Sequence, residues 1–345
     1  MTGFLQREKF YGVTIGASLT MRRIKIDRGW EISGNEVTPE SVAMNRRQFL
    51  RGTGMLGLYS TALWAGCSFS HDPIDEKIIF HEIEKKLYPA KRNPYYILDR
   101  ELTAEKVAAQ YNNFYEFGGN KEDPRYLAQK LKTRPWVLEV KGLVGKPAKF
   151  DFDDLLKSMP MEERIYRFRC VEAWAMVVPW TGFPLSALLK KVEPLSQATH
   201  IRFTTFHKPF TAQGQLAFWY PWPYAEGLTL QEAMNDLTFM AVGIYGHPLP
   251  KQHGAPIRLV VPWKYGYKSA KSIVSIEFLD YQPPTFWTTQ QGLEYDFEAN
   301  VDPRVAHPRW PQAREKMIGT GEERFTLLFN GYSEQVAQMY TGQFM

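Results

Sequence analysis

The stretch RIYRFRCVEAWAM, residues 164–176, contains Cys170, one of only two cysteines in the chain. In an extended strand side chains alternate between the two faces, so Arg167 and Arg169 would face away from the sulfur. The arginines therefore need not activate the thiol, although cations beside a cysteine favour its thiolate form. Local chemistry leaves three interpretations open: a buried inert thiol, which is the commonest outcome, a nucleophile, or a metal ligand.

Two of these interpretations require partners that the sequence does not place beside Cys170. A cysteine nucleophile needs a base within hydrogen-bond reach, and a zinc site needs closely spaced pairs of ligands. The histidines that are candidates for either role are His200, His207, His247 and His253. No protease motif surrounds the cysteine, and the spacing of these histidines is not that of a zinc site. Both interpretations are therefore less favoured than an inert thiol.

Composition narrows the class of protein. The 345-residue chain is 44% hydrophobic and 23% charged, which is typical of a globular protein. A formal net charge of +5 suits an anionic ligand but lacks the basic stripe of a nucleic-acid binder, so no nucleic-acid partner is expected. Two cysteines cannot form a disulfide framework, so the stability must come from a hydrophobic core.

Short strands mixed with short helices, without a repeating βαβ order, predict an α+β domain. Alternating apolar residues predict strands at 136–141 and 200–206, and residues 257–261 and 272–280 are predicted to be buried strands. Helices are expected at 103–117, 186–191 and 227–240. Thr103 is the expected N-cap of the first helix, and Thr229 with Glu232 has the spacing of a capping box.

The N-terminal region is expected to carry an export signal. Arg46-Arg47 precedes a short apolar run, which is typical of a twin-arginine signal peptide at residues 44–67. The run is too short to span a bilayer comfortably. Residues 1–43 are interpreted as an extra or mis-assigned extension, and residues 68–345 as one catalytic domain. At Cys67, cleavage of the signal peptide without lipidation is favoured over attachment of a lipid. The alternative to a signal peptide is a chance Arg-Arg pair or an uncleaved membrane anchor.

Two further stretches are candidate ligand-binding segments. One is YNNFYEF, residues 111–117, where amide side chains lie among aromatic ones. The other is a loop between two predicted strands that gathers four cations, with glycines on either side: Arg258, Lys264, Lys268 and Lys271, with Gly254 and Gly266. Fixed cations and backbone amides on such a loop suit a phosphate or pyrophosphate. A solvated basic loop is the alternative.

Together, several motifs resemble a known family. YNNFYEF, RCVEAWAM, FTTF, YPWPYAEGLTLQEAMNDL and HGAPIRLVVPWKYGYKSAKSI occur in the order seen in the catalytic subunits of bacterial periplasmic protein-methionine-sulfoxide reductases. The resemblance runs from about Phe80 to the C-terminus. It implies a sulfite-oxidase-like, molybdopterin-binding α+β fold with mixed sheets and short helices.

The resemblance also implies roles for individual residues. Cys170, in RCVEAWAM, would be the one protein thiolate bound to molybdenum and the catalytic residue. The cofactor-binding positions would be Asn112, Tyr115, Glu116, Thr205, His253, Arg258, Ser269, Ala270 and Lys271. His253 departs from the family, which usually has asparagine before Gly-Ala-Pro. We therefore expect protonation of His253 to make cofactor binding or electronics more sensitive to pH.

The activity that the resemblance implies is oxygen-atom transfer from methionine sulfoxide residues of oxidised periplasmic proteins, as protein repair. It further implies one molybdopterin-bound molybdenum per chain, no haem in this chain, a membrane haem b-binding electron donor and export by the twin-arginine machinery to the periplasm. The alternatives are a sulfite oxidase-like enzyme acting on sulfite or a small S- or N-oxide, and a non-catalytic exported binding protein. The aromatic run at residues 218–224 could border the substrate entrance, but ordinary loop packing is favoured.

Overall fold

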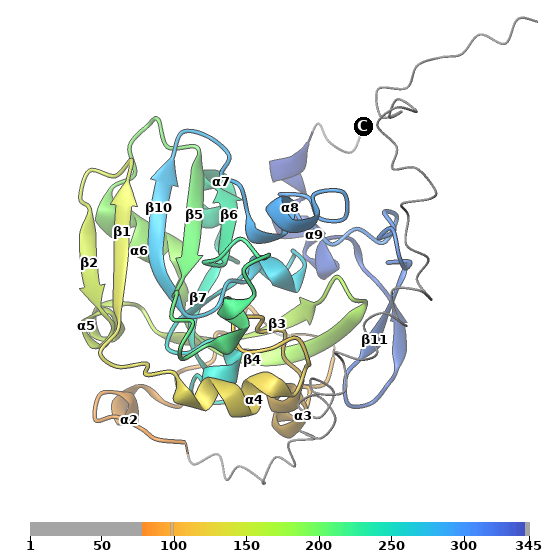
Figure 1. Ribbon diagram of the computed structural model, residues 1–345, viewed down its shortest axis with the longest axis horizontal. Coiled ribbons are helices and arrows are strands. Elements are labelled where there is room, and N and C mark those ends of the chain that lie inside the picture. The colour runs from red at the N-terminus through yellow and green to blue at the C-terminus, as the bar shows by residue number, and fades with distance from the viewer. Residues whose placement is uncertain (1–77, 97, 99, 342–345) are drawn as a thin grey trace, which may run out of the picture. The chain divides into compact units, whose positions relative to one another are not determined.

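The computed structural model describes residues 78–341 except 97 and 99 (Figure 1). The described residues belong to one compact unit. Within them, no helix is both long and apolar enough to span a lipid bilayer. The extension predicted at 1–43, the signal peptide predicted at 44–67 and Cys67 lie outside the described residues.

Strands form two mixed sheets. The first has the order β2-β1-β10-β5-β6, with these strands side by side in Figure 1. Its strands are β1 (Val137–Gly142), β2 (Ala148–Asp151), β5 (His200–Thr205), β6 (Ala225–Thr229) and β10 (Ile273–Leu279). β1 and β10 pair in parallel, and the other pairs are antiparallel. Alternate residues of β5 are buried, because one face of this strand covers the core.

The second sheet carries the stretch that contains Cys170. It has seven strands: β3 (Glu162–Arg169), β4 (Trp174–Pro184), β7 (Phe239–Ile244), β8 (His247–Pro248), β9 (Arg258–Val260), β11 (Arg314–Met317) and β12 (Glu323–Phe325). β4 is central, since it pairs with β3, β7 and β11. Ten of its eleven residues are buried, which is the pattern of a strand covered on both faces.

The helices are short. They are α2 (Glu84–Leu87), α3 (Glu105–Gln110), α4 (Asp123–Leu127), α5 (Phe152–Ser158), α6 (Leu185–Val192), α7 (Leu230–Met234), α8 (Phe286–Gln291) and α9 (Ser333–Val336). Of these, α5 to α8 lie between strands in the chain. In α6 the buried residues have the 3.6-residue spacing of an amphipathic helix: Leu185, Leu188, Leu189 and Val192. One hydrophobic cluster spans both sheets and includes Trp180, Phe203 and Trp263. The α+β prediction of mixed sheets and short helices is confirmed.

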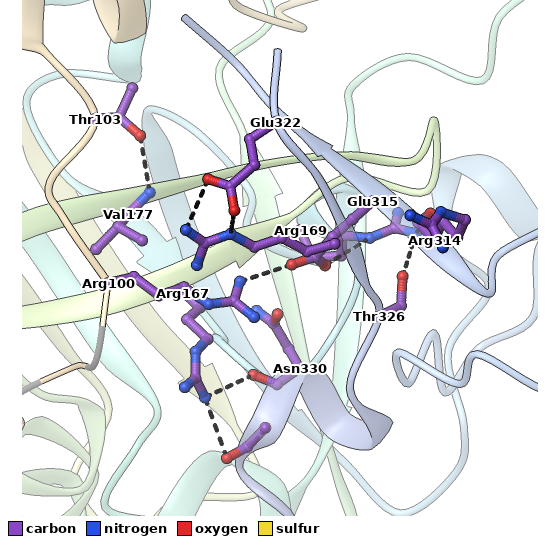
Figure 2. Close-up of polar contacts among 12 residues, drawn as sticks. Arg100, Thr103, Arg167, Arg169, Val177, Arg314, Glu315, Glu322, Thr326 and Asn330 are labelled. Atoms are coloured by element: carbon purple, nitrogen blue, oxygen red, sulfur yellow. Dashed lines mark hydrogen bonds and ion pairs between the residues drawn. The ribbon is translucent and has the colours of Figure 1, made fainter. Parts of the chain in front are cut away.

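Two helix predictions were wrong in extent. α3 begins at Glu105 and ends at Gln110, and Thr103 does not cap it. The Thr103 hydroxyl accepts a hydrogen bond from Val177 N at 3.0 Å, and Thr103 N donates to Val177 O at 2.9 Å (Figure 2). Thr103 therefore adds to the edge of β4, and residues 111–117 are left as an irregular segment.

The second over-long prediction is the helix at 227–240. Its capping box is present, because Glu232 N donates to Thr229 Oγ1 and Thr229 N to Glu232 Oε2. The helix stops at Met234, because Asn235 leaves the helical conformation and its Oδ1 accepts from Leu237 N at 2.9 Å. The ends of the predicted range belong to β6 and β7 instead.

Candidate active site

Cys170 lies in the tight turn of the β3–β4 hairpin. Cys170 N donates to Trp174 O at 2.9 Å, and Ala173 N donates to Cys170 O at 3.1 Å. Ala173 closes the turn with a φ of 64°, in the left-handed region. The hairpin thus fixes the backbone of Cys170 at the end of a strand, and the side chain lines a cavity.

The cavity brings together the residues predicted from separate motifs. Nine of them line it: Asn112, Tyr115, Glu116, Cys170, His253, Arg258, Ser269, Ala270 and Lys271. Thr205, the tenth, is not among the lining residues; its hydroxyl donates to Glu116 Oε1 at 3.0 Å from behind the wall. The four segments that supply these side chains are far apart in the chain, so the folded sheets create the site.

The sulfur of Cys170 is a protonated thiol in this environment. Burial raises its pKa to about 12, and the negative charge of Glu172 acts in the same direction. Arg169 opposes this shift only weakly. Within the described residues the hydrogen-bond partners of Sγ are Asn113 Nδ2 and Glu172 Oε2, each at 3.7 Å, and Glu172 N at 3.5 Å. No described histidine bonds to the sulfur, so the arrangement is not that of an activated nucleophile.

The sequence interpretation missed a polar cluster beside the thiol, formed by Asn113, Lys121 and Glu172. Lys121 Nζ lies 2.5 Å from Glu172 Oε2, and Asn113 Nδ2 lies 3.1 Å from the same oxygen. Trp174 Nε1 also donates to this oxygen at 2.9 Å. Burial opposes ionisation of Glu172, but these donors hold its pKa below the ordinary value. The positions of Asn113 in YNNFYEF and of Glu172 in RCVEAWAM were the available signals.

At another part of the cavity, a buried cation lacks an anionic partner. The guanidinium of Arg258 donates to backbone carbonyls, those of His253 at 2.9 Å, Ser269 at 3.2 Å and Leu259 at 3.3 Å. No carboxylate among the described residues pairs with it. Burial lowers the pKa of Arg258 to about 9. Such a group is costly to bury, and an anionic ligand would offset that cost.

Lys271 lies in the same cluster. Its Nζ donates to the backbone oxygen of Asn113 at 2.6 Å. Burial and then the charge of Arg258 lower its pKa to about 7, while burial raises the pKa of Glu116 to about 7. Gly254 has a φ of +98°, and a Cβ there would lie 2.6 Å from Lys271 Cβ. The glycine is therefore needed for the close approach that places Lys271 in the cavity.

The expected pH sensitivity at His253 is not supported. Its side chain is buried, and its pKa is lowered to about 3 by burial first and then by the charges of Arg258 and Lys271. The imidazole is therefore neutral across the pH range in which bacteria live. A neutral imidazole can still donate one hydrogen bond, as the usual asparagine would.

Outside the thiol the cavity continues into an aromatic recess. Tyr111, Tyr115, Trp174, Trp287 and Tyr295 line both the cavity and the recess. The ring centroids of Tyr115 and Trp287 lie 5.1 Å apart, and those of Trp287 and Tyr295 lie 4.8 Å apart. Stacked and edge-to-face rings of this kind make a rigid apolar wall. The recess joins the polar cluster to the outside of the molecule.

The arginines beside Cys170 do lie on the other face of β3, as strand alternation predicts. Arg169 is fully buried there and pairs with Glu315 at 3.3 Å (Figure 2), and its Nη2 donates to Gln312 Oε1 at 2.8 Å. Arg167 Nη1 donates to the carbonyls of Asn330 and Gly331. Both side chains tie the hairpin to the C-terminal segments rather than to the sulfur.

The donor set fits a molybdopterin cofactor better than a bare metal ion. Within the described residues, no group of three or more histidine, cysteine, aspartate or glutamate side chains could hold a metal. A single soft sulfur donor, Cys170, lies in the same cavity as Lys271 and as Arg258, which no described carboxylate pairs with. A phosphate-bearing cofactor that brings its own metal ligands would match both features.

Comparisons with known proteins agree with this chemistry. Residues 126–287 match the model of the oxidoreductase molybdopterin binding domain. The chain is 46% identical to the protein-methionine-sulfoxide reductase catalytic subunit MsrP of Burkholderia mallei, over 91% of this chain and 94% of that protein. It is 47% identical to MsrP of Pseudomonas syringae pv. tomato, over 89% of this chain and 94% of that protein.

Among solved structures, the sulfane dehydrogenase SoxCD from Paracoccus pantotrophus matches with a TM-score of 0.43 and 16% identity. The match covers 85% of this chain and 65% of the SoxCD chain. The identity to the two reductases, over about nine tenths of the chain, is what decides the family. The chain belongs to the family of protein-methionine-sulfoxide reductase catalytic subunits, which are molybdopterin-binding oxidoreductases.

Proposed function

We propose that this protein reduces methionine sulfoxide residues in proteins to methionine, with a molybdenum cofactor held in the cavity that Cys170 lines. The observation that carries the proposal is one cavity in which a buried thiol meets a buried arginine, Arg258, that no described carboxylate pairs with. Relatives with the same overall length carry the name of this reductase. The overall reaction consumes two electrons and two protons and converts the sulfoxide to a thioether and water.

In this proposal each part of the cavity has a separate task. Cys170 Sγ would be the protein ligand of the metal, as a thiolate. Arg258, His253, Ser269 and Lys271 would hold the phosphate end of the cofactor. Asn112, Tyr115, Glu116 and Ala270 would hold the pterin, and Thr205 orients Glu116 through the 3.0 Å hydrogen bond.

When bound, the cofactor supplies the two-electron chemistry that accepts an oxygen atom from the substrate. The chain itself supplies position and polarity. Lys121 neutralises the carboxylate of Glu172 next to the sulfur and presents a partly exposed ammonium group to the recess. The aromatic walls of the recess suit the apolar methyl and methylene groups on either side of the sulfoxide.

The proposal also covers the cofactor content of the chain, its electron donor and its location in the cell. One molybdenum and no haem are assigned to this chain, and the electrons come from a membrane haem b-binding subunit. The description of the relatives as catalytic subunits supports a partner subunit. The paired arginines at 46–47 support export by the twin-arginine machinery to the periplasm, where oxidised proteins are the substrates. Cleavage of the signal is favoured over lipid attachment at Cys67.

The test is a comparison of substrates with the purified, cofactor-loaded protein. With a reduced viologen as electron donor, methionine sulfoxide should be reduced. With an artificial electron acceptor, sulfite should be oxidised slowly or not at all. Efficient oxidation of sulfite without reduction of the sulfoxide would overturn the proposal in favour of a sulfite oxidase-like enzyme. Loaded protein that turns over neither substrate would point to a binding protein on this scaffold.

A further inference from the structure

The aromatic run at 218–224 is divided between the core and the surface. Tyr224 is buried, whereas Phe218 is 88% exposed and Trp219 is 62% exposed. Loop packing, the interpretation favoured from the sequence, is therefore right for Tyr224 and wrong for the two residues that begin the run. Large exposed aromatic side chains that lie together often mark a binding surface. Phe218 and Trp219, with ring centroids 5.3 Å apart, are here called the aromatic platform.

The backbone beneath the platform is firmly held. Gln215 is buried, and its amide donates to Phe206 O and accepts from Lys208 N, both at 2.7 Å. Gly214 packs so closely that a Cβ would lie 2.0 Å from Tyr115 O. The loop that carries the platform is thus fastened to the segment that supplies Tyr115 to the cavity. A rigid backbone lets exposed aromatic groups bind a partner at little cost in conformational entropy.

The platform is continuous with the aromatic recess. The ring centroids of Trp219 and Tyr220 lie 6.1 Å apart, and those of Tyr220 and Tyr115 lie 6.4 Å apart. Tyr220 lines the recess together with Trp174 and Glu172. A side chain that reaches from the recess toward Cys170 would therefore bring its neighbouring residues across Tyr220 and onto the platform.

The surface has the chemistry of a site for varied apolar sequences. Residues 209–225 contain no charged side chain. Two further apolar side chains of this loop, Phe210 and Leu216, are 95% and 58% exposed. An uncharged aromatic surface binds apolar groups without selecting for a particular charge pattern.

We propose that the aromatic platform is the docking site for the protein substrate, where it binds apolar side chains adjacent in sequence to the methionine sulfoxide. The occupant is an extended segment of an oxidised polypeptide, because its sulfoxide must enter the recess that begins beside Trp219. This inference rests on the proposed function and adds a subsite to it. The platform contributes to binding of the polypeptide and takes no part in the reduction.

The experiment compares two substrates of the same enzyme, with a reduced viologen as the donor. One substrate is free methionine sulfoxide, and the other is an oxidised, unfolded protein rich in methionine. For the double variant Phe218→Ala/Trp219→Ala, kcat/KM for the protein substrate should fall about tenfold or more, mainly through a higher KM. The value for free methionine sulfoxide should stay within about twofold of the wild type.

Matched controls separate docking from folding. Phe325 on β12 is 71% exposed and is not among the residues that line the recess. Phe325→Ala should therefore leave both values unchanged. Molybdenum content and Tm are measured for each variant, and the single variant Phe218→Ser replaces the double variant if the latter unfolds.

Several outcomes would overturn the inference. Equal losses of kcat/KM for both substrates would show that the platform supports the structure of the catalytic site. No loss for either substrate would show that the platform does not bind the protein substrate. If viologen-driven activity is unchanged and only quinol-driven activity through the membrane subunit falls, the platform docks the electron donor. A wild type that fails to reduce free methionine sulfoxide would instead contradict the proposed function itself.

Discussion

At the scale of single residues, the cavity holds ionisable side chains whose charged forms are destabilised by loss of contact with water. Glu116 is buried and Lys271 is partly buried, and desolvation moves the pKa of each to about 7. Arg258 is buried without a carboxylate partner. These groups lower the stability of the cofactor-free protein and suit an anionic cofactor, a trade-off that is common in binding sites.

Replacing Lys271 with methionine tests this trade-off. In the folded protein the pKa of Lys271 is depressed from 10.5 to about 7, so its ammonium form is penalised at and below pH 7. The penalty shrinks as the pH rises from 7 toward 10.5, where the unfolded chain also loses its proton. Lys271→Met should raise the free energy of unfolding of the cofactor-free protein by about 2 kcal/mol at pH 6.5 and by much less at pH 9.5.

Urea unfolding of cofactor-free wild type and variant at the two pH values measures this difference. The same variant should retain little molybdenum when it is produced in cofactor-sufficient cells. Lys132, an exposed lysine, provides the control: Lys132→Met should change the free energy of unfolding little at either pH. If Lys271→Met raises the free energy of unfolding less at pH 6.5 than at pH 9.5, the pKa argument is contradicted.

His253 provides a second test at this scale. Because its pKa is about 3, the imidazole stays neutral between pH 5.5 and 8 and does not titrate there. His253→Asn, which restores the residue usual in the family, should therefore leave the shape of the pH profile of kcat/KM unchanged. A profile shifted by about one pH unit or more would show that this histidine titrates in the working enzyme.

At the scale of elements, irregular segments rather than helices or strands supply most of the cavity. α3 ends at Gln110, so the side chains of residues 112–116 can converge on the cavity instead of spiralling around a helix. The short 3₁₀ helix η3 (Gln213–Leu216) packs against this segment through Gly214. The conformation of the cofactor-binding segment therefore depends on a neighbouring loop.

Gly214→Ala tests that dependence. The added methyl group would lie 2.0 Å from Tyr115 O, so the loop or the segment must move. We expect the free energy of unfolding to fall by about 1–3 kcal/mol and the molybdenum content to fall with it. Gly119→Ala is the control, because a Cβ there meets no atom within 4 Å. Equal molybdenum content in the two variants would show that the contact does not shape the site.

Only some of the helices and strands could be predicted correctly from the sequence. Apolar alternation located β1 and β5, because these strands have one buried face and one more exposed face. β10 was predicted as a buried strand, although only three of its seven residues are buried. The helix predicted at 103–117 was too long, because pairing of Thr103 with Val177 and the demands of the cavity override local helix propensity. The loop cations were found from residue chemistry and the ligand role of Cys170 from motif resemblance. Lys121 was missed because its contacts with Asn113 and Glu172 exist only in the folded chain.

At the scale of the whole molecule, a buried ion cluster joins the hairpin of Cys170 to the C-terminal strands. Glu315 on β11 pairs with Arg100 at 2.6 Å and with Arg169 at 3.3 Å (Figure 2). Arg169 Nη1 also donates to the carbonyl of Cys170. The position of the hairpin turn therefore depends on residues more than 140 positions away in the sequence.

Removing the charge of Glu315 should have a large effect on stability. Glu315→Gln leaves two arginines without their buried carboxylate, so the free energy of unfolding should fall by about 3–5 kcal/mol. Glu323, which forms an exposed ion pair with Arg314, is the matched control, and Glu323→Gln should cost less than about 1 kcal/mol. Urea unfolding of both variants gives the comparison, and similar losses for the two would refute a special role for the buried cluster.

The central claim is that Cys170 binds molybdenum in this cavity, and metal analysis tests it most directly. Wild-type protein purified from molybdenum-replete bacteria should contain about one molybdenum per chain. Cys170→Ala should fold, with a free energy of unfolding changed by only about 1 kcal/mol, since a small thiol is replaced by a methyl group. The variant should lack sulfoxide reductase activity and the molybdenum signal of a thiolate-bound site. A Cys170→Ala protein that keeps the wild-type molybdenum spectrum and activity would contradict the assignment.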